Sequence, residues 1–202
     1  VRPKARDYRR FLPDYIKYNS TRKPEYAIKT LLYRDDQGKR FVVKAGTTPA
    51  ANAHIESLSE KVEAIAAANP QLTVLRAVET SRALGSYQFL SFIRYPFVEG
   101  QSLSEILRDM IKDGVAPIRE LAETVDLVLG VKDGSVQPAN FDCQFDNVIM
   151  ADGRPTLIDC EWVFDEAVDV RFLQYRILYY WYMEYRELLA YEDALAFLRN
   201  FG

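Results

Sequence analysis

The order of its predicted elements makes this chain an α+β protein with two lobes, in which a sheet-rich lobe precedes a helical lobe. Before about residue 95, branched and aromatic residues gather in short runs, with one helix among them. After residue 102, apolar residues recur mostly at helical spacing, interrupted by one small hairpin. With 202 residues, of which 49% are hydrophobic and 27% charged, the chain can bury a core of its own.

The first lobe, expected at about residues 18–95, is built on an antiparallel sheet. Four strands are predicted, at residues 26–33, 40–44, 72–78 and 87–95. Turn chemistry at residues 35–38 joins the first two into a hairpin. A helix follows them, with Thr48 expected as its N-cap and Pro49 in its first turn. Its apolar stripe consists of Ile55, Leu58, Val62 and Ile65.

The second lobe, expected at about residues 102–202, is reached through a linker at residues 95–101. Ser102 is predicted to open a helix, and a second helix covers about residues 117–129. Two short strands, at residues 147–150 and 156–159, form a hairpin. From about residue 168 the chain is helical and rich in aromatic residues, which indicates a helix buried in this lobe. One expected stripe on it contains Phe172, Tyr175, Tyr179 and Tyr182.

Composition excludes several classes of function. A net charge of −3 gives no indication of nucleic acid as a partner, and no apolar run is long enough to span a membrane. The two cysteines, Cys143 and Cys160, are expected to be buried fillers in a reducing, cytoplasmic compartment. His54, the single histidine, is expected on the surface or in helix packing, so any chemistry depends on carboxylates and lysine.

Residues 1–17 are strongly basic, and the chain begins at Val1 rather than at methionine. Both features predict a solvated linker to an upstream domain in a longer protein. A membrane-surface patch is the alternative interpretation of the same charges.

The sharpest chemical pattern lies in the second lobe. Asp142 and Asn147 are five residues apart, so one loop can present both side chains to a shared pocket. Asp159 is expected at the end of the second strand of the hairpin, facing that loop. Carboxylate and amide oxygens hold Mg²⁺ in phosphoryl transfer, and a further carboxylate orients the attacking hydroxyl.

This arrangement resembles the catalytic loop and metal motif of the protein-kinase-like superfamily, most closely its small-molecule branch of choline and aminoglycoside kinases. The resemblance implies that Asp142 is the catalytic base, Asn147 a metal ligand, Asp159 the principal metal ligand and Glu161 an additional carboxylate. Glu161 could instead cap a backbone group or form a salt bridge, for example with Arg171 or Arg176. Residues 158–164 also resemble kinase-like domains attached to bacterial glycosyltransferases and methyltransferases of surface-polysaccharide assembly.

The resemblance extends over about residues 18–164. Lys44 ends the strand expected at residues 40–44 and matches the lysine that such kinases carry on their third strand, paired with a glutamate of the next helix. Glu60 is the expected partner by spacing, with Glu56 the second choice. The segment around Pro96 and Val98 resembles the hinge, which implies adenine contacts from the Pro96 carbonyl and the Val98 N–H.

Three departures separate the chain from this family. Residues 18–25 contain no glycine where a glycine-rich phosphate loop is usual. Asn140 replaces the usual histidine two residues before the catalytic aspartate. The chain after Asp159 is short for a full kinase helical lobe, so protein substrates are not expected.

The sequence therefore predicts an ATP- and Mg²⁺-dependent phosphotransferase that acts on a hydroxyl of a small molecule or glycan end. One alternative is a catalytically inactive, kinase-like module that binds or regulates a partner domain in polysaccharide assembly. A weaker alternative is a polysaccharide-recognition domain that uses the aromatic helix.

Overall fold

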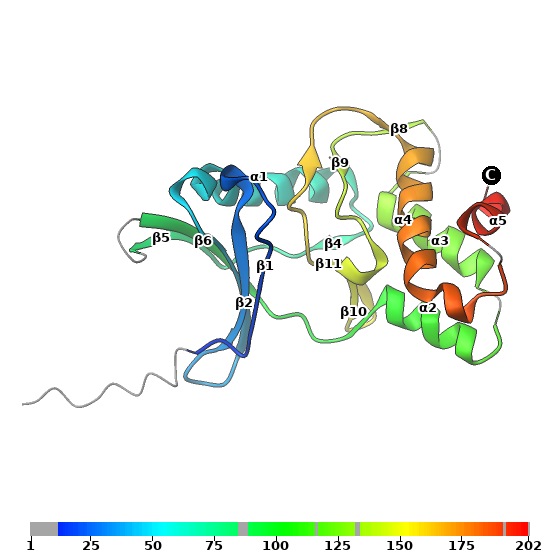
Figure 1. The fold of residues 1–202 in the computed structure, drawn as a ribbon, viewed down its shortest axis with the longest axis horizontal. Coiled ribbons are helices and arrows are strands. Elements are labelled where there is room, and N and C mark those ends of the chain that lie inside the picture. Colours follow the sequence, from blue (N-terminus) through cyan, green and yellow to red (C-terminus); the bar gives the residue numbers. More distant parts are fainter. Residues whose placement is uncertain (1–11, 85–88, 116, 132–133, 192, 202) are drawn as a thin grey trace, which may run out of the picture. The chain divides into compact units, whose positions relative to one another are not determined.

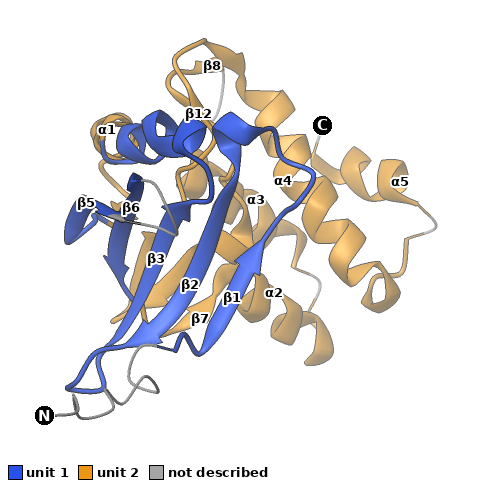
Figure 2. Ribbon diagram, turned by 60° about the vertical axis from the view of Figure 1, so that its left-hand side comes forward, with its two compact units in different colours: residues 1–59, 76–97 blue, residues 60–75, 98–202 orange. Residues whose placement is uncertain are grey.

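The structure, a computed structural model, describes residues 12–84, 89–115, 117–131, 134–191 and 193–201. The chain divides into two units, coloured separately in Figure 2. Unit 1 comprises Val1–Ser59 and Arg76–Phe97, and unit 2 comprises Glu60–Leu75 and Val98–Gly202. The segment Glu60–Leu75 therefore belongs with the helical unit, although the sequence suggested one continuous first lobe over residues 18–95.

Unit 1 is built on a five-stranded antiparallel sheet with the strand order β1-β2-β3-β6-β5 (Figure 1). Its strands are β1 (Tyr15–Tyr18), β2 (Ile28–Arg34), β3 (Arg40–Gly46), β5 (Glu79–Leu84) and β6 (Phe89–Pro96). The hairpin predicted between β2 and β3 is present. In its turn, the Asp35 carboxylate accepts the N–H groups of Gln37 and Lys39 at 2.9 Å each.

Three details of this sheet differ from expectation. β5 was not predicted at all, because its sequence lacks clear alternation of apolar and polar residues. The strand expected at residues 72–78 is reduced to β4 (Thr73–Val74), which belongs to unit 2. β1 begins at Tyr15, inside the segment expected as a linker, and residues 1–11 of that segment lie outside the described residues.

The predicted first helix consists of a 3₁₀ turn, Pro49–Ala51, followed by α1 (Asn52–Ala68). Thr48 occupies the N-cap position, but its hydroxyl donates to the Pro24 carbonyl at 2.8 Å and caps no helical N–H. The start of α1 is instead tied to β6, because Asn52 accepts the Ser91 N–H at 2.8 Å. His54 is buried, and its ring meets that of Tyr26 edge-on at 5.2 Å.

Unit 2 contains α2 (Leu103–Lys112), α3 (Ile118–Leu129), α4 (Val170–Tyr185) and α5 (Ala194–Leu198). The N-terminus of α2 is set by a capping box, in which Ser102 and Glu105 satisfy each other's backbone N–H groups. α3 and α4 pack side by side (Figure 1). The second half of α1 joins this core through Val62 and Ile65, and Asn69 donates to two carbonyls in the last turn of α3.

A four-stranded sheet with the order β4-β11-β10-β7 brings together distant parts of unit 2. It contains the predicted hairpin of β10 (Val148–Ala151) and β11 (Arg154–Leu157), with β7 (Gln101–Ser102) at one edge. Gly100, just before β7, has φ = +145°, and a Cβ there would lie 2.2 Å from the Met150 carbonyl oxygen. Only glycine allows the chain to pass β10 this closely.

The aromatic helix α4 is buried on one side only. Trp181 and Tyr182 lie in the core, where both contact Phe197 of α5. Phe172 and Tyr179, expected on a buried stripe with Tyr182, are instead 53% and 41% exposed. Aromatic residues occur on most sides of this helix, so the sequence alone did not show which side faces the core. The stripe was therefore expected to be buried when half of it is exposed.

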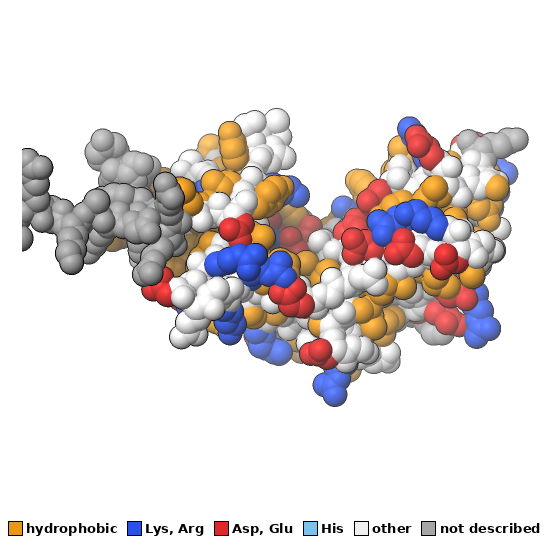
Figure 3. Space-filling view, turned by 90° about the horizontal axis from the view of Figure 1, so that it is seen from below, with side chains coloured by type: hydrophobic (Ala, Val, Ile, Leu, Met, Phe, Trp, Pro, Cys, Tyr) orange, Lys and Arg blue, Asp and Glu red, His pale blue; other side chains and the backbone are white. Residues whose placement is uncertain are grey.

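Among the described residues, no helix is both long enough and apolar enough to cross a membrane. The face shown in Figure 3 carries acidic and basic side chains in close alternation. In α2, Arg108 and Lys112 both pair with Asp109.

Candidate active site

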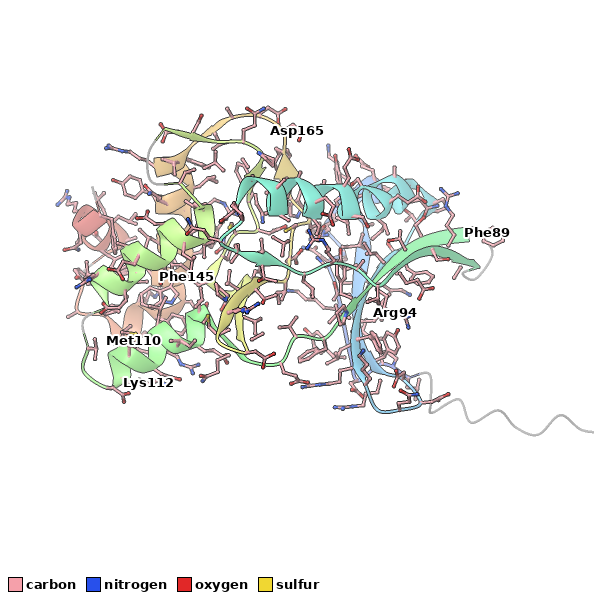
Figure 4. All side chains as sticks on the ribbon, turned by 180° about the vertical axis from the view of Figure 1, so that it is seen from behind. Phe89, Arg94, Met110, Lys112, Phe145 and Asp165 are labelled. Atoms are coloured by element: carbon pink, nitrogen blue, oxygen red, sulfur yellow. The ribbon has the colours of Figure 1, made fainter. Side chains whose placement is uncertain are left out.

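The loop between β9 (Ala139–Asn140) and β10 carries the predicted catalytic residues, and its fold depends on one buried ring. Phe145, labelled in Figure 4, is 2% exposed and meets Trp181 edge-on at 6.5 Å. Phe145 also begins the 3₁₀ turn Phe145–Asn147, which leads directly into β10. This anchor explains how a loop without regular secondary structure can hold side chains in fixed positions.

Asp142 is held by hydrogen bonds of its backbone and of its side chain within unit 2. Its N–H donates to Asn140 Oδ1 at 2.9 Å, and its carbonyl accepts Asn147 Nδ2 at 2.8 Å. Its carboxylate Oδ2 accepts the Trp162 N–H at 2.7 Å. The backbone and the side chain of Asp142 are therefore both fixed, as a residue that orients a substrate hydroxyl requires.

The hairpin brings Asp159 to the same loop. Ile158 donates its N–H to the Asn147 carbonyl at 2.9 Å, and the Asn140 amide lies 3.5 Å from the Asp159 carbonyl. Asp159 does not end a strand, as the sequence suggested, because β11 stops at Leu157 and Asp159 follows two residues later. Asn140, where the family usually has histidine, thus contacts the backbone of both proposed catalytic aspartates.

The amide of Asn147 is oriented by its hydrogen bond. Because Nδ2 donates to the Asp142 carbonyl, Oδ1 points away from that bond and is the atom left to act as a ligand. Among the described residues, no group of three or more His, Cys, Asp or Glu side chains is arranged to hold a metal ion. A protein site of one amide and one or two carboxylates is the kind that Mg²⁺ uses when substrate phosphates and water supply the remaining ligands.

Glu161 is buried at 4% exposure. Its backbone carbonyl accepts a hydrogen bond from Lys61 Nζ at 2.7 Å, which ties the second half of α1 to the segment after Asp159. Arg171 and Arg176, the salt-bridge partners considered for Glu161, form no ion pair among the described residues. Sequence reasoning did not select Lys61, although its place on the helix beside three glutamates was visible.

Lys44 lies in β3, the third strand of the five, and is 7% exposed. It pairs with Thr30 of β2 and Ile93 of β6, so it lies on an interior strand of the sheet and not at an edge. An ammonium group this deeply buried is kept in proteins only when it is paired.

The helix glutamates are placed differently from one another. Glu56 accepts hydrogen bonds from Ser91 Oγ at 2.6 Å and Arg82 Nε at 2.7 Å, and these bonds lower its pKa. The second choice for a partner of Lys44 is therefore already engaged with β5 and β6. Glu60 is exposed on α1 and falls in unit 2, whereas Lys44 falls in unit 1.

The predicted hinge contains the point where the chain passes from unit 1 to unit 2, between Phe97 and Val98. The Phe97 N–H donates to the Arg40 carbonyl at 3.1 Å, next to the facing residues Pro96 and Phe41. Pro96 and Phe41 therefore face each other at a position where β3 and β6 form no backbone hydrogen bonds. The sheet does not need the N–H that proline lacks.

The segment in place of a glycine-rich loop is a short polar turn after β1. Asn19 Oδ1 accepts both the N–H and the hydroxyl of Thr21, at 2.8 and 2.7 Å. Arg22 reaches the Tyr26 carbonyl at 3.4 Å. The side chains of this turn thus satisfy one another locally.

Both cysteines are buried and unoxidised. Burial raises the pKa of the Cys143 thiol to about 12, with a smaller effect from the nearby Asp142 charge. Its thiol donates to the Val128 carbonyl at 3.3 Å. Cys143 therefore stays protonated at neutral pH and acts as a packing residue.

No protein-family model matches the chain, and no curated protein matches it. Solved structures do match. Amicoumacin kinase hAmiN, in complex with AMP-PNP, Ca²⁺ and Ami, is 12% identical with a TM-score of 0.52, and the match covers 94% of this chain and 71% of that chain. The PknI kinase domain of Mycobacterium tuberculosis is 16% identical with a TM-score of 0.42, and the match covers 81% of this chain and 71% of that chain.

At these identities the comparison bears on the fold alone. The match to amicoumacin kinase extends over nearly the whole chain. It agrees with the antiparallel sheet of unit 1, the predominantly helical unit 2 and the hairpin that follows the Asp142 loop. The chain therefore has the protein-kinase-like fold that its sequence predicts.

Proposed function

We propose that this protein is an ATP- and Mg²⁺-dependent phosphotransferase that acts on a hydroxyl group of a small molecule or glycan end. The observation that supports the proposal most is the hydrogen-bonded loop that links Asp142, Asn147 and Asp159. A protein that only bound a partner would have no chemical need to hold an aspartate and an asparagine in this way.

In the proposed reaction, Asp142 orients the acceptor hydroxyl and accepts its proton. The acceptor O–H bond breaks, a bond forms from that oxygen to the γ-phosphorus of ATP, and the bond from this phosphorus to the β–γ bridging oxygen breaks to release ADP. The hydrogen bond from the Trp162 N–H fixes the orientation of the Asp142 carboxylate, which would receive the proton of the hydroxyl.

Asn147 and Asp159 are the proposed Mg²⁺ ligands, with Glu161 as an additional carboxylate. When bound, Mg²⁺ neutralises charge on the transferring phosphates. Lys61 holds the segment of these carboxylates through the Glu161 carbonyl. The role of this contact is to keep the ligand segment in one conformation before nucleotide binds.

Lys44 is the proposed contact to the α- and β-phosphates, with Glu60 as its proposed partner. Lys44 is deeply buried in a central strand, so it does not serve as a surface charge that keeps the protein soluble, which supports a functional role. The Pro96 carbonyl and the Val98 N–H are the proposed contacts to adenine. Because Pro96 lacks only an N–H, it can still accept a hydrogen bond from the adenine amino group.

Thermal unfolding tests the nucleotide site directly. The parent protein is heated with ATP, with MgCl₂ and with both, beside an Asp159→Asn variant and a matched Asp165→Asn control. Asp165 is exposed and follows β12 (Val163–Phe164), as Figure 4 shows. At a hundredfold excess over Kd, a bound ligand adds about 2.7 kcal/mol to the free energy of unfolding, which raises Tm by about 5–10 °C at this chain length.

The proposal predicts a Tm shift that requires both ATP and Mg²⁺, is lost in Asp159→Asn and is kept in Asp165→Asn. No shift at millimolar ATP and Mg²⁺ would contradict it. Equal Tm shifts in Asp159→Asn and Asp165→Asn would instead show that Asp159 is not a metal ligand.

One observation favours an inactive kinase-like module as the second candidate. The turn at Asn19 and Thr21 satisfies its own donors, so these groups are not presented to phosphate. This candidate predicts no phosphate release from ATP in the presence of any acceptor, even where nucleotide binds. The upstream domain stays a prediction, because the comparisons give it no support and residues 1–11 lie outside the described residues.

A further inference from the structure

An exposed aromatic surface borders the Asp142 loop within unit 2. It consists of Phe164 of β12 together with Phe172, Arg176, Tyr179 and Tyr180 of α4, arranged around the half-buried Phe141. The four outer rings are each 41–53% exposed. Large aromatic rings are usually buried, so a contiguous exposed group of them indicates a binding surface.

The rings contact one another rather than standing alone. Phe141 meets Phe164 edge-on at 5.3 Å and Phe172 at 6.0 Å. Tyr179 and Tyr180 meet edge-on at 5.7 Å. These contacts limit the rotamers of the rings, so a ligand that covers them orders few side chains on binding.

Arg176 lies within this surface, and its guanidinium group lies against two aromatic rings. Its guanidinium carbon is 4.8 Å from the centre of the Tyr180 ring and 5.6 Å from that of Phe141. Among the residues that the structure describes, it forms no hydrogen bond and no ion pair. Stacking fixes the plane of a guanidinium and leaves its N–H edges directed outward, where they bind carboxylate or phosphate.

The surface is continuous with the proposed catalytic base. Phe141 precedes Asp142 in the chain, and the Phe141 N–H donates to the carbonyl of Trp162, whose own N–H binds the Asp142 carboxylate. Phe164 follows Trp162 by two residues and pairs with Ala139 of β9. These hydrogen bonds connect the segments that carry the rings to the carboxylate that is proposed to receive the acceptor's proton.

We propose that this surface binds the phosphoryl acceptor, and that the acceptor is a sugar ring bearing a negatively charged phosphate or carboxylate group. The C–H face of a pyranose covers the aromatic rings, Arg176 binds the anionic group, and a ring hydroxyl meets Asp142. The positive charge of Arg176 disfavours cationic acceptors. This inference rests on the proposed function and names its substrate class.

The test measures sugar binding without nucleotide, so that it does not depend on the ATP site. Four probes that share one pyranose ring are titrated by saturation-transfer NMR: glucose 1-phosphate, glucuronate, glucose and glucosamine. The proteins are the parent, Arg176→Gln, Arg176→Lys and the control Arg171→Gln. Arg171 is an exposed arginine of the same helix for which the structure shows no ring contact.

We expect glucose 1-phosphate and glucuronate to bind on the order of tenfold more tightly than glucose, because hydrogen bonds between charged groups are stronger than those between neutral groups. Glucosamine should bind most weakly, because its ammonium group carries the same charge as Arg176. Arg176→Gln removes this preference, while Arg171→Gln keeps it. Arg176→Lys keeps part of the preference for anionic sugars. If Arg176→Gln does not fold, the Arg176→Lys variant tests whether Arg176 causes the preference. The relative affinity of the two anionic probes distinguishes phosphate from carboxylate.

Preference for glucosamine, or equal loss in the Arg171→Gln control, would overturn the inference. So would anionic binding that is unchanged in Arg176→Gln. A protein that gains stability from ATP and Mg²⁺ but binds none of the four sugars would refute the acceptor and leave the nucleotide site standing. Sugar binding without any nucleotide effect would refute the proposed phosphotransferase and favour a carbohydrate-recognition role.

Discussion

Replacing Asn140 by alanine removes the side chain that connects the two proposed catalytic aspartates. Asn140 is 4% exposed, and its Oδ1 accepts the Asp142 N–H at 2.9 Å. Its Nδ2 lies 3.5 Å from the Asp159 carbonyl and 3.7 Å from Cys160 Sγ. In the variant the backbone N–H of the half-buried Asp142 loses its hydrogen-bond partner.

The size of the effect follows from these distances. A buried donor left without a partner costs about 1–3 kcal/mol, whereas the two longer contacts are near the limit for hydrogen bonds and add little. We therefore expect Asn140→Ala to lower the free energy of unfolding by about 2 kcal/mol, roughly a thirtyfold change in the folding equilibrium. With a urea m-value of about 2 kcal/mol/M, the midpoint falls by about 1 M.

Urea unfolding followed by circular dichroism measures this change. The matched control is Asn200→Ala, because the Asn200 amide also makes two contacts as a donor, to the carbonyls of Ala196 and Phe197, but the residue is exposed. The control should stay within about 0.5 kcal/mol of the parent. If Asn140→Ala unfolds at the same urea concentration as Asn200→Ala, the structural role assigned to Asn140 is wrong.

Three further outcomes are expected. Gly100→Ala should lower Tm by several degrees, because its Cβ would collide with a carbonyl of β10; an unchanged melting curve would show that this close approach is absent. Cys143 should resist iodoacetamide at pH 8 until the protein is unfolded in guanidinium, because its pKa is raised to about 12; rapid labelling of the folded protein, followed by mass spectrometry, would contradict this. The bonds from Ser91 and Arg82 lower the pKa of Glu56, so their stabilising effect is complete above its ordinary pKa and is lost as the pH falls through the lowered value. The Tm difference between the parent and Glu56→Gln should therefore be present at pH 7 and should shrink towards pH 3, whereas a constant difference would contradict this linkage.

The elements that the sequence predicted well are those in which local chemistry and burial agree. The Asp35 turn and the Ser102 capping box are both fixed by side chains a few residues apart, so short-range rules are sufficient. β4 and β5 depend instead on partners distant in the chain, β11 and β6. The sequence of β5 carries little periodicity, so nothing local distinguishes it from a loop, and nothing local shows that the strand predicted over residues 72–78 is as short as β4.

For the candidate site, motif spacing predicted the Asp142–Asn147 loop but not the contacts that hold it. The Trp162 N–H that binds Asp142 and the Lys61 ammonium that binds the Glu161 carbonyl come from segments 20 and 100 residues away. Backbone donors carry no sequence signature, so the first contact could not have been predicted. The second could have been suspected only once the orientation of α1 was known.

That orientation can be worked out from the apolar stripe of α1. Each residue advances about 100° around a helix, so Glu60, two residues from both Leu58 and Val62, points about 160° away from each of them. Leu58 and Val62 are both buried, which leaves Glu60 on the exposed face. Lys61 is about 60° from Leu58 and 100° from Val62, at the border of the buried face. Periodicity therefore favours Lys61 over Glu60 as the inward-reaching charge of this helix, whereas the spacing of the family motif favours the opposite choice.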